Sequence, residues 1–196
     1  MDIQDFEQRL AAAKRGDEDA FVVLFRSVQP ALLRYLRSLG GPLAEDAAAD
    51  TWVSVVRGLD RFSGDEAGWR AWVMTIGRAR LRDAQRKAAR TPIPFDVAEM
   101  YAAVPDGVDV HASVEEIFST EAALEIIGRL PPEQAETVLL RYVAGLDVGH
   151  TAEVMGKRPG AVRVSAHRGL RRLAAMLQDA GWPVEGCNGA RQSVDS

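Results

Sequence analysis

The sequence predicts an all-α protein made of two small helical domains, joined by a flexible acidic linker, with a helix-turn-helix in the C-terminal domain. Three observations support this fold class. Apolar residues recur every three or four positions along most of the chain, no segment shows sustained β alternation, and an acidic, proline-containing segment divides the chain in the middle. We therefore expect an N-terminal helical domain over residues 1–90, a linker over 91–120, a C-terminal domain over 121–178 and an unstructured tail over 179–196.

The N-terminal domain is expected to contain three long helices. Residues 17–41 have helical apolar spacing and stop at Gly40-Gly41-Pro42. Residues 43–62 form the second predicted helix, with Trp52, Val55, Val56 and Leu59 on its apolar side. A polar loop leads into the third helix, residues 69–90, which carries seven basic residues and one acid, Asp83. This composition predicts a strongly basic helical surface in a chain whose net charge is negative.

Two tryptophans open the third predicted helix. Aromatic residues beside basic ones suit stacking with unpaired bases of single-stranded DNA. Trp72 and Ile76, however, are spaced at i and i+4, which favours a position in the core. We expect Trp72 in the core, whereas Trp69 remains open between the core and a base-stacking surface.

The linker segment, residues 91–120, has three prolines and six acids but no lysine or arginine. It is longer than the loops that usually connect helices inside one compact domain. Its composition therefore predicts an extended, flexible connection.

The C-terminal domain is expected to end in a helix-turn-helix. Val138, Leu139, Tyr142 and Val143 are its first predicted core positions. Two shorter helices follow, separated by Gly156; Asp147 is a suitable N-cap for the first, and Pro159 suits the first turn of the second. A short helix, a glycine turn and a second helix are typical of this motif.

The second helix of the motif is basic. Residues 155–173, MGKRPGAVRVSAHRGLRRL, contain six basic residues and no acid, although the whole chain has a net charge of −4. We expect the apolar side to consist of Ala161, Val162, Ala166, Leu170 and Leu173, and the outer side of Arg163, His167, Arg168, Arg171 and Arg172. The turn, the proline and the basic face together favour contact with a DNA major groove over a merely solvated surface.

Other classes of function have little support in the sequence. His111, His150 and His167 show no metal-ligand spacing with one another or with Cys187, the single cysteine. No nucleophile motif or glycine-rich phosphate loop is present, so we expect neither an enzyme nor a bound cofactor or metal. No apolar run approaches the roughly 20 residues that cross a bilayer, and the N-terminus lacks the features of a signal peptide. The expected location is the cytoplasm.

Four segments in order resemble an extracytoplasmic-function (ECF) sigma factor of the sigma-70 family, over about residues 18–178. AFVVLFRSVQPALLRYLRSL resembles the opening helix, and AEDAAADTWVSVVRGLDRF the helix that docks on the polymerase clamp. WRAWVMTIGRARLRD resembles the helix that reads the promoter −10 element. The segment from LPPEQAETVLLRY to AHRGLRRL resembles the reader of the −35 element.

The resemblance implies specific partners and site residues. It implies binding to core RNA polymerase, through its beta and beta-prime subunits, and to promoter DNA, as well as control by an anti-sigma factor. The implied clamp contacts are Glu45, Asp46 and Asp50. The implied −10 contacts are Phe62, Ser63, Gly64, Asp65, Trp69, Arg78, Arg82 and Arg86. The implied −35 contacts are Arg158, Arg163, Ser165, His167, Arg168 and Arg171.

The sequence departs from the family pattern at several positions, so it does not predict which promoter is read. Ala79 stands where the −10 helix often has asparagine, Val164 and Ser165 replace the usual serine and arginine, and Arg158 replaces a common serine cap.

The expected function is that of a sigma factor whose two basic modules make separate contacts with one promoter and help to open the duplex. Two alternatives remain. One is a stand-alone helix-turn-helix regulator that acts without polymerase, although no obvious dimerisation helix follows Leu177. The other is an adaptor whose basic helices bind an acidic protein partner.

Overall fold

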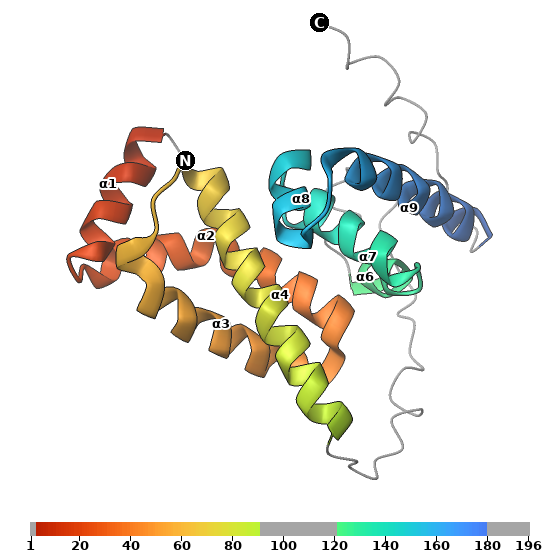
Figure 1. Ribbon diagram of the computed structural model, residues 1–196, viewed down its shortest axis with the longest axis horizontal. Helices are drawn as coiled ribbons and strands as arrows, with labels where there is room; N and C mark the ends of the chain where they lie inside the picture. Colours follow the sequence, from red (N-terminus) through yellow and green to blue (C-terminus); the bar gives the residue numbers. More distant parts are fainter. Residues whose placement is uncertain (1–2, 91–120, 180–196) are drawn as a thin grey trace, which may run out of the picture.

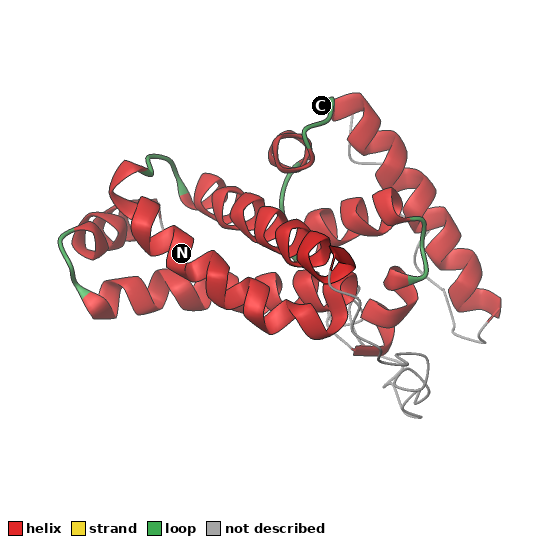
Figure 2. Cartoon of the chain, turned by 60° about the horizontal axis from the view of Figure 1, so that its bottom comes forward, coloured by secondary structure: helices red, strands yellow, loops and turns green. Residues whose placement is uncertain are grey.

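The computed structural model describes residues 3–90 and 121–179, and all regular elements within these two ranges are helical (Figures 1 and 2). This confirms the predicted all-α class. The predictions for the linker, residues 91–120, and for nearly all of the tail fall outside the described residues.

The N-terminal half has four helices: α1 (Ile3–Lys14), α2 (Glu18–Gly40), α3 (Ala44–Gly58) and α4 (Glu66–Arg90). Single 3-10 turns follow α2 (Gly41–Leu43) and α3 (Leu59–Arg61). Helix α1 was not among the predicted helices. Its buried residues Phe6, Leu10 and Ala13 are spaced four and three apart, so the periodic signal was present in the sequence but short.

Helix α2 forms the centre of this half. Asp17 caps its N-terminus by accepting a hydrogen bond from the Ala20 amide at 2.9 Å. The helix ends where predicted, and Gly41 follows it with a φ of 50°. Helix α4 packs closely against α2, because a Cβ atom on Gly77 would lie 2.6 Å from Leu32 Cδ1. Glycine at position 77 therefore sets how near the two helices can come.

Helix α3 buries one stripe and leaves a second apolar pair in solvent. Its buried residues are Ala44, Ala47, Ala48, Thr51, Trp52 and Val55. Val56 was predicted on this apolar side, but its side chain is 56% exposed. One residue turns an α-helix by about 100°, which carries Val56 out of the stripe that ends at Val55.

The C-terminal half comprises α6 (Glu121–Gly128), α7 (Pro132–Val138), a π-helical turn (Leu139–Val143), α8 (Val148–Met155) and α9 (Pro159–Asp179). Asp147 caps α8 by accepting a hydrogen bond from the His150 amide at 2.8 Å. Gly156 ends α8 in the left-handed conformation, with φ 65°, and Pro159 begins α9. These three predictions are confirmed. Tyr142 was predicted in the core but is 37% exposed.

The two halves pack against each other. Helix α8 contacts α4, and α6 and the π-helical turn contact α2. Buried residues of the C-terminal half, including Ile127, Leu140 and Met155, belong to the same apolar cluster as Leu32 and Leu36 of α2. The division into two domains stays a prediction; in this conformation the two predicted domains share one apolar cluster rather than lying apart. The apolar faces of α6 and α8 are covered by the N-terminal half, which removes their surface from water.

Among the described residues, no helix is both long enough and apolar enough to cross a membrane.

Candidate nucleic-acid and polymerase interfaces

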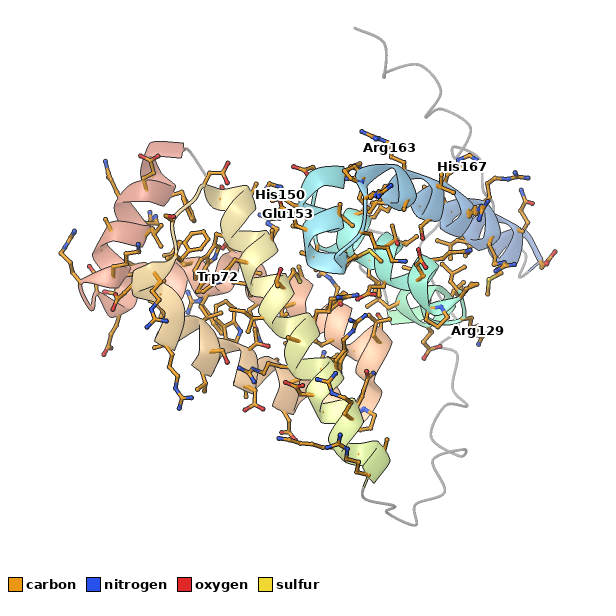
Figure 3. The ribbon with its side chains drawn as sticks, in the orientation of Figure 1. Trp72, Arg129, His150, Glu153, Arg163 and His167 are labelled. Atoms are coloured by element: carbon orange, nitrogen blue, oxygen red, sulfur yellow. The ribbon has the colours of Figure 1, made fainter. Side chains whose placement is uncertain are left out.

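Helix α9 presents a basic face to solvent. Arg158, just before the helix, is exposed, as are the four remaining basic residues of the predicted −35 set: Arg163, His167, Arg168 and Arg171. Arg172 and Val164, the latter 50% exposed, lie on the same open surface. Figure 3 shows Arg163 and His167 pointing away from the N-terminal half. No ion pair with a described acid engages these arginines, so the face is available to an anionic partner.

Ser165 does not belong to this face. Its side chain is only 7% exposed, and its hydroxyl oxygen lies 3.0 Å from Thr137 Oγ1 and 3.4 Å from the Glu133 carbonyl oxygen. Ser165 lies in the buried stripe with Val162, Ala166 and Gly169. The prediction that Ser165 contacts DNA is therefore withdrawn. Ala161 shows the reverse error, since it was expected in the core and is exposed.

The predicted −10 loop has a buried aromatic base and an exposed tip. Phe62 is 8% exposed; its ring stacks on Trp72, with centroids 5.0 Å apart, and meets Trp69 edge-on at 5.4 Å. Lys14 Nζ donates a hydrogen bond to the Phe62 carbonyl oxygen at 2.5 Å, which ties the loop to α1. Ser63, Gly64 and Asp65 are exposed.

Trp69 belongs to the core. Its side chain has no exposed surface, and its indole N–H donates to the Leu24 carbonyl oxygen at 3.4 Å. Trp72, which we expected in the core, packs against the core cluster but is only partly buried. Phe62 and Trp69 are thus withdrawn from the set of predicted DNA contacts, because neither ring offers a face on which a base can stack.

The basic face of α4 meets a carboxylate of the other half. Arg78 Nε lies 2.5 Å from Glu136 Oε1, and Arg78 Nη2 lies 3.3 Å from Oε2. The Arg78 and Glu136 side chains are 14% and 13% exposed. Arg82 Nη2 lies 3.8 Å from the same Oε2. Arg86 instead pairs with Asp83 on its own helix and is 64% exposed. Glu136 had no predicted role.

Tyr35 completes this cluster from α2. Its ring is buried, and its hydroxyl donates to Glu136 Oε1 at 3.0 Å. Burial, followed by the negative charge of Glu136, raises the pKa of the Tyr35 hydroxyl well above its ordinary value. The cluster therefore holds a neutral phenol, a carboxylate and two guanidinium groups between the halves.

We expect Tyr35 to ionise only when alkali opens the protein. Because folding raises its pKa, the stability linked to this group is fully present below about pH 10 and is lost as the pH rises beyond that value. Absorbance of tyrosinate near 295 nm should show a late component that coincides with loss of helical circular dichroism. The Tyr35→Phe variant should lack this component. Superimposable titrations of variant and wild type would contradict the assignment.

The outer face of α3 combines acids with exposed valines. Asp46 and Asp50 are exposed, and Glu45 pairs with Arg37 at 2.8 Å. The hydrogen bond from Arg37 lowers the pKa of Glu45. Val53 and Val56, one and two turns further along, are 48% and 56% exposed. Adjacent acids and solvent-facing valines make α3 suitable for docking onto a protein with basic and apolar surface.

Residues 3–90 and 121–179 contain no cluster of His, Cys, Asp or Glu side chains that could hold a metal ion.

An exposed basic helix-turn-helix, a second basic helix and a mixed acidic and apolar helix define a two-part, DNA-binding helical protein. Known families match both parts. The family model for sigma-70 region 2 matches residues 24–91, and the model for sigma-70 region 4 matches residues 120–173.

Curated relatives give the same result over most of the chain. The ECF RNA polymerase sigma factor ShbA of Streptomyces griseus is 34% identical over 181 residues, which cover 85% of this chain and 92% of ShbA. CarQ of Myxococcus xanthus, an RNA polymerase sigma factor, is 32% identical over 169 residues, covering 83% of this chain and 91% of CarQ. BldN of Streptomyces coelicolor is 34% identical, but the match covers only 64% of its length.

Solved structures share the fold. CnrH, solved in complex with the cytosolic domain of CnrY, superposes with a TM-score of 0.61 at 24% identity and covers 89% of this chain and 98% of CnrH. The sigma factor RpoE of Bartonella quintana, solved with the anti-sigma factor NepR, gives 0.57 at 22% identity, covering 84% and 98%. The chain belongs to the ECF RNA polymerase sigma factors of the sigma-70 family.

Proposed function

We infer that this protein binds core RNA polymerase and directs promoter-specific initiation of transcription through −10 and −35 elements. The observation that carries the inference is the arrangement of two chemically different exposed faces on a sigma-70 chain. The basic outer face of α9 suits DNA, and the acidic and apolar outer face of α3 suits a protein. We place this activity in the cytoplasm, where bacterial RNA polymerase works.

Each face receives a role. Arg158, Arg163, His167, Arg168 and Arg171 contact the −35 element in the major groove, where arginine pairs with guanine edges or holds phosphates. Helix α3 docks on the polymerase clamp, the site implied for the beta-prime and beta subunits, through Glu45, Asp46, Asp50, Val53 and Val56.

The −10 element is contacted by the loop tip and by α4. The exposed Ser63, Gly64 and Asp65 lie where a flipped base is captured once it has left the stack. Arg78, Arg82 and Arg86 then hold the phosphates of the adjoining strand. Strand opening is driven by binding energy, and no covalent step by this chain is required.

An anti-sigma factor is the proposed regulator. CnrH was solved with the cytosolic domain of CnrY, and RpoE with the anti-sigma factor NepR. The exposed valines of α3 and the basic face of α9 give such a partner two surfaces to cover.

Reconstituted transcription tests the proposed function. Purified protein added to core polymerase and a genomic template library should produce transcripts from a defined set of start sites, and polymerase alone should not. Absence of promoter-selective transcripts would overturn the proposal. Tight operator binding without polymerase, combined with no stimulation of transcription, would identify a stand-alone regulator instead.

Arg163→Ala tests how α9 reads DNA. If Arg163 pairs with a base edge, its loss should cost about 1–3 kcal/mol at one −35 base pair and leave other positions unaffected. Affinities of the polymerase complex for a panel of single-base promoter variants measure this directly. Arg15→Ala, which removes an exposed cation outside α9, is the matched control. A uniform loss across the panel would make Arg163 a phosphate contact.

A further inference from the structure

The two halves of the molecule present their functional faces unequally. The basic face of α9 and the outer face of α3 are exposed. The basic face of α4 is not equally free, because Arg78 is nearly buried against Glu136 and Arg82 lies at the edge of the same pair. In this conformation the surface proposed for the −10 element is therefore partly covered by the C-terminal half.

The contact with Glu136 is specific in its geometry. Both carboxylate oxygens are used: Oε1 accepts from Arg78 at 2.5 Å and from Tyr35 at 3.0 Å, and Oε2 lies 3.3 Å from Arg78 and 3.8 Å from Arg82. Paired N–H donors from one guanidinium to both oxygens of a carboxylate form one of the stronger polar contacts in proteins. A phosphate diester would present the same arrangement of oxygens to Arg78. Glu136 thus occupies the place that a DNA phosphate needs.

Promoter binding by both halves requires them to separate. Elements at −10 and −35 are about 25 base pairs apart, or roughly 85 Å at 3.4 Å per base pair. A compact body of the described size has a radius of gyration of only about 15 Å. The conformation in which α8 packs on α4 cannot place α4 and α9 on both elements of a straight duplex.

We propose that Glu136 is an autoinhibitory clasp: in the free protein it occupies Arg78 and Arg82 of α4 and holds the halves together, and it must release them before α4 binds DNA. Because the α3 face is exposed in the closed form, polymerase docks first and the halves separate afterwards. The mechanism is reversible, since on opening both Glu136 and Arg78 return to water and neither is left as an isolated buried charge. This inference rests on the proposed function for its biological meaning, but its structural part is independent of polymerase.

Glu136→Gln tests the clasp on the full chain. The variant keeps the shape of the side chain and an acceptor for Tyr35 but removes the charge that compensates the desolvated Arg78. Glu133→Gln is the matched control: Glu133 lies on the same helix, and its partner at 2.6 Å is Lys157 of its own half. Spin labels at exposed positions on the two facing helices, Ala67→Cys of α4 and Glu153→Cys of α8 in a Cys187→Ser background, report the distance between the halves by double electron–electron resonance.

We expect a narrow, short distance distribution for the wild type and for Glu133→Gln. For Glu136→Gln we expect a population with longer distances to increase at least about tenfold, because an uncompensated buried guanidinium favours separation. The same variant should bind a mixed-sequence single-stranded oligodeoxynucleotide several-fold more tightly than wild type, without polymerase. Arg78→Lys keeps the charge but cannot form two parallel hydrogen bonds with Glu136, so it should also increase the population with longer distances. This second variant keeps the proposal testable if Glu136→Gln fails to fold.

Unchanged distance distributions in both Glu136→Gln and Arg78→Lys would overturn the proposal. Opening without tighter binding of the oligonucleotide would overturn it as well, because Glu136 would then hold the halves without masking the DNA-binding surface. Failure of the proposed function has a different signature: neither wild type nor Glu136→Gln would support promoter-selective transcription, whatever their distance distributions.

Discussion

Replacing Val53 and Val56 together by glutamate is expected to weaken binding to core RNA polymerase by about 30-fold or more. Both side chains are about half exposed on α3 and lie outside its buried stripe, so the substitution removes little packing inside the protein. Central residues of protein interfaces often contribute about 2 kcal/mol or more, and each 1.4 kcal/mol changes affinity about tenfold. The new carboxylates would have to be desolvated beside Asp46 and Asp50.

Affinity for core polymerase, measured by fluorescence anisotropy of labelled protein, provides the test. Glutamate favours helices more than valine does, which offsets the cost of negative charge near the end of α3, so the double variant should unfold near the wild-type denaturant concentration. Val22→Glu is the matched control, because Val22 is an exposed valine on α2, outside the α3 face. Equal affinities for the double variant and the control would show that polymerase does not use this face.

Trp69→Ala is expected to destabilise the protein by about 3–5 kcal/mol. The indole has no exposed surface, packs edge-on against Phe62 and lies 5.5 Å from Trp72 between ring centroids. Truncation leaves a cavity under the loop proposed to contact the −10 element and removes the donor to the Leu24 carbonyl. Since single domains are stable by only about 5–15 kcal/mol, the loss should be obvious in chemical denaturation.

Comparison with Trp72→Ala tests whether Trp69 is a core residue or a base-stacking residue. Trp72 is partly exposed, so its truncation should cost less stability than that of Trp69. If Trp69→Ala unfolds at the wild-type denaturant concentration but fails to bind the single-stranded −10 element, Trp69 would be a base-stacking residue, contrary to its buried position.

The helix-turn-helix was predictable because its signals are local. Asp147, Gly156 and Pro159 each favour one backbone state at one position: an N-cap, a left-handed end and a first turn. Such preferences do not depend on what the rest of the chain does. The ends of α8 and the start of α9 were therefore correct from the sequence.

Ser165 was predicted to contact DNA and Val56 to face the core. Both predictions followed the type of residue rather than its spacing along the helix. Val162, Ser165, Ala166 and Gly169 stand at i, i+3, i+4 and i+7, which is the buried stripe of α9. A serine in such a stripe is buried if its hydroxyl finds a partner, as it does at Thr137. Val56 is apolar but falls outside the stripe of α3. In both helices the periodic pattern contained the correct answer.

The contacts of Glu136 could not be predicted from the sequence around it. Its partners Arg78 and Tyr35 lie 58 and 101 positions away in the sequence, and the three meet only because α7 and its neighbours pack on α2 and α4. Nothing in the spacing around Glu136 marks it as more than a solvated helix residue. Packing of the two halves likewise depends on matching surfaces that one-dimensional patterns do not encode.

Photocross-linking from the two surfaces proposed to bind DNA, within one polymerase–promoter complex, tests the account most directly. A photoreactive amino acid at His167 reports on α9, and one at Ser63 reports on the loop before α4; both positions are exposed. The account predicts cross-links to the same promoter at two sites about 25 base pairs apart, roughly 85 Å along a straight duplex. Cross-links from both positions to one overlapping site, or from only one of them, would contradict it.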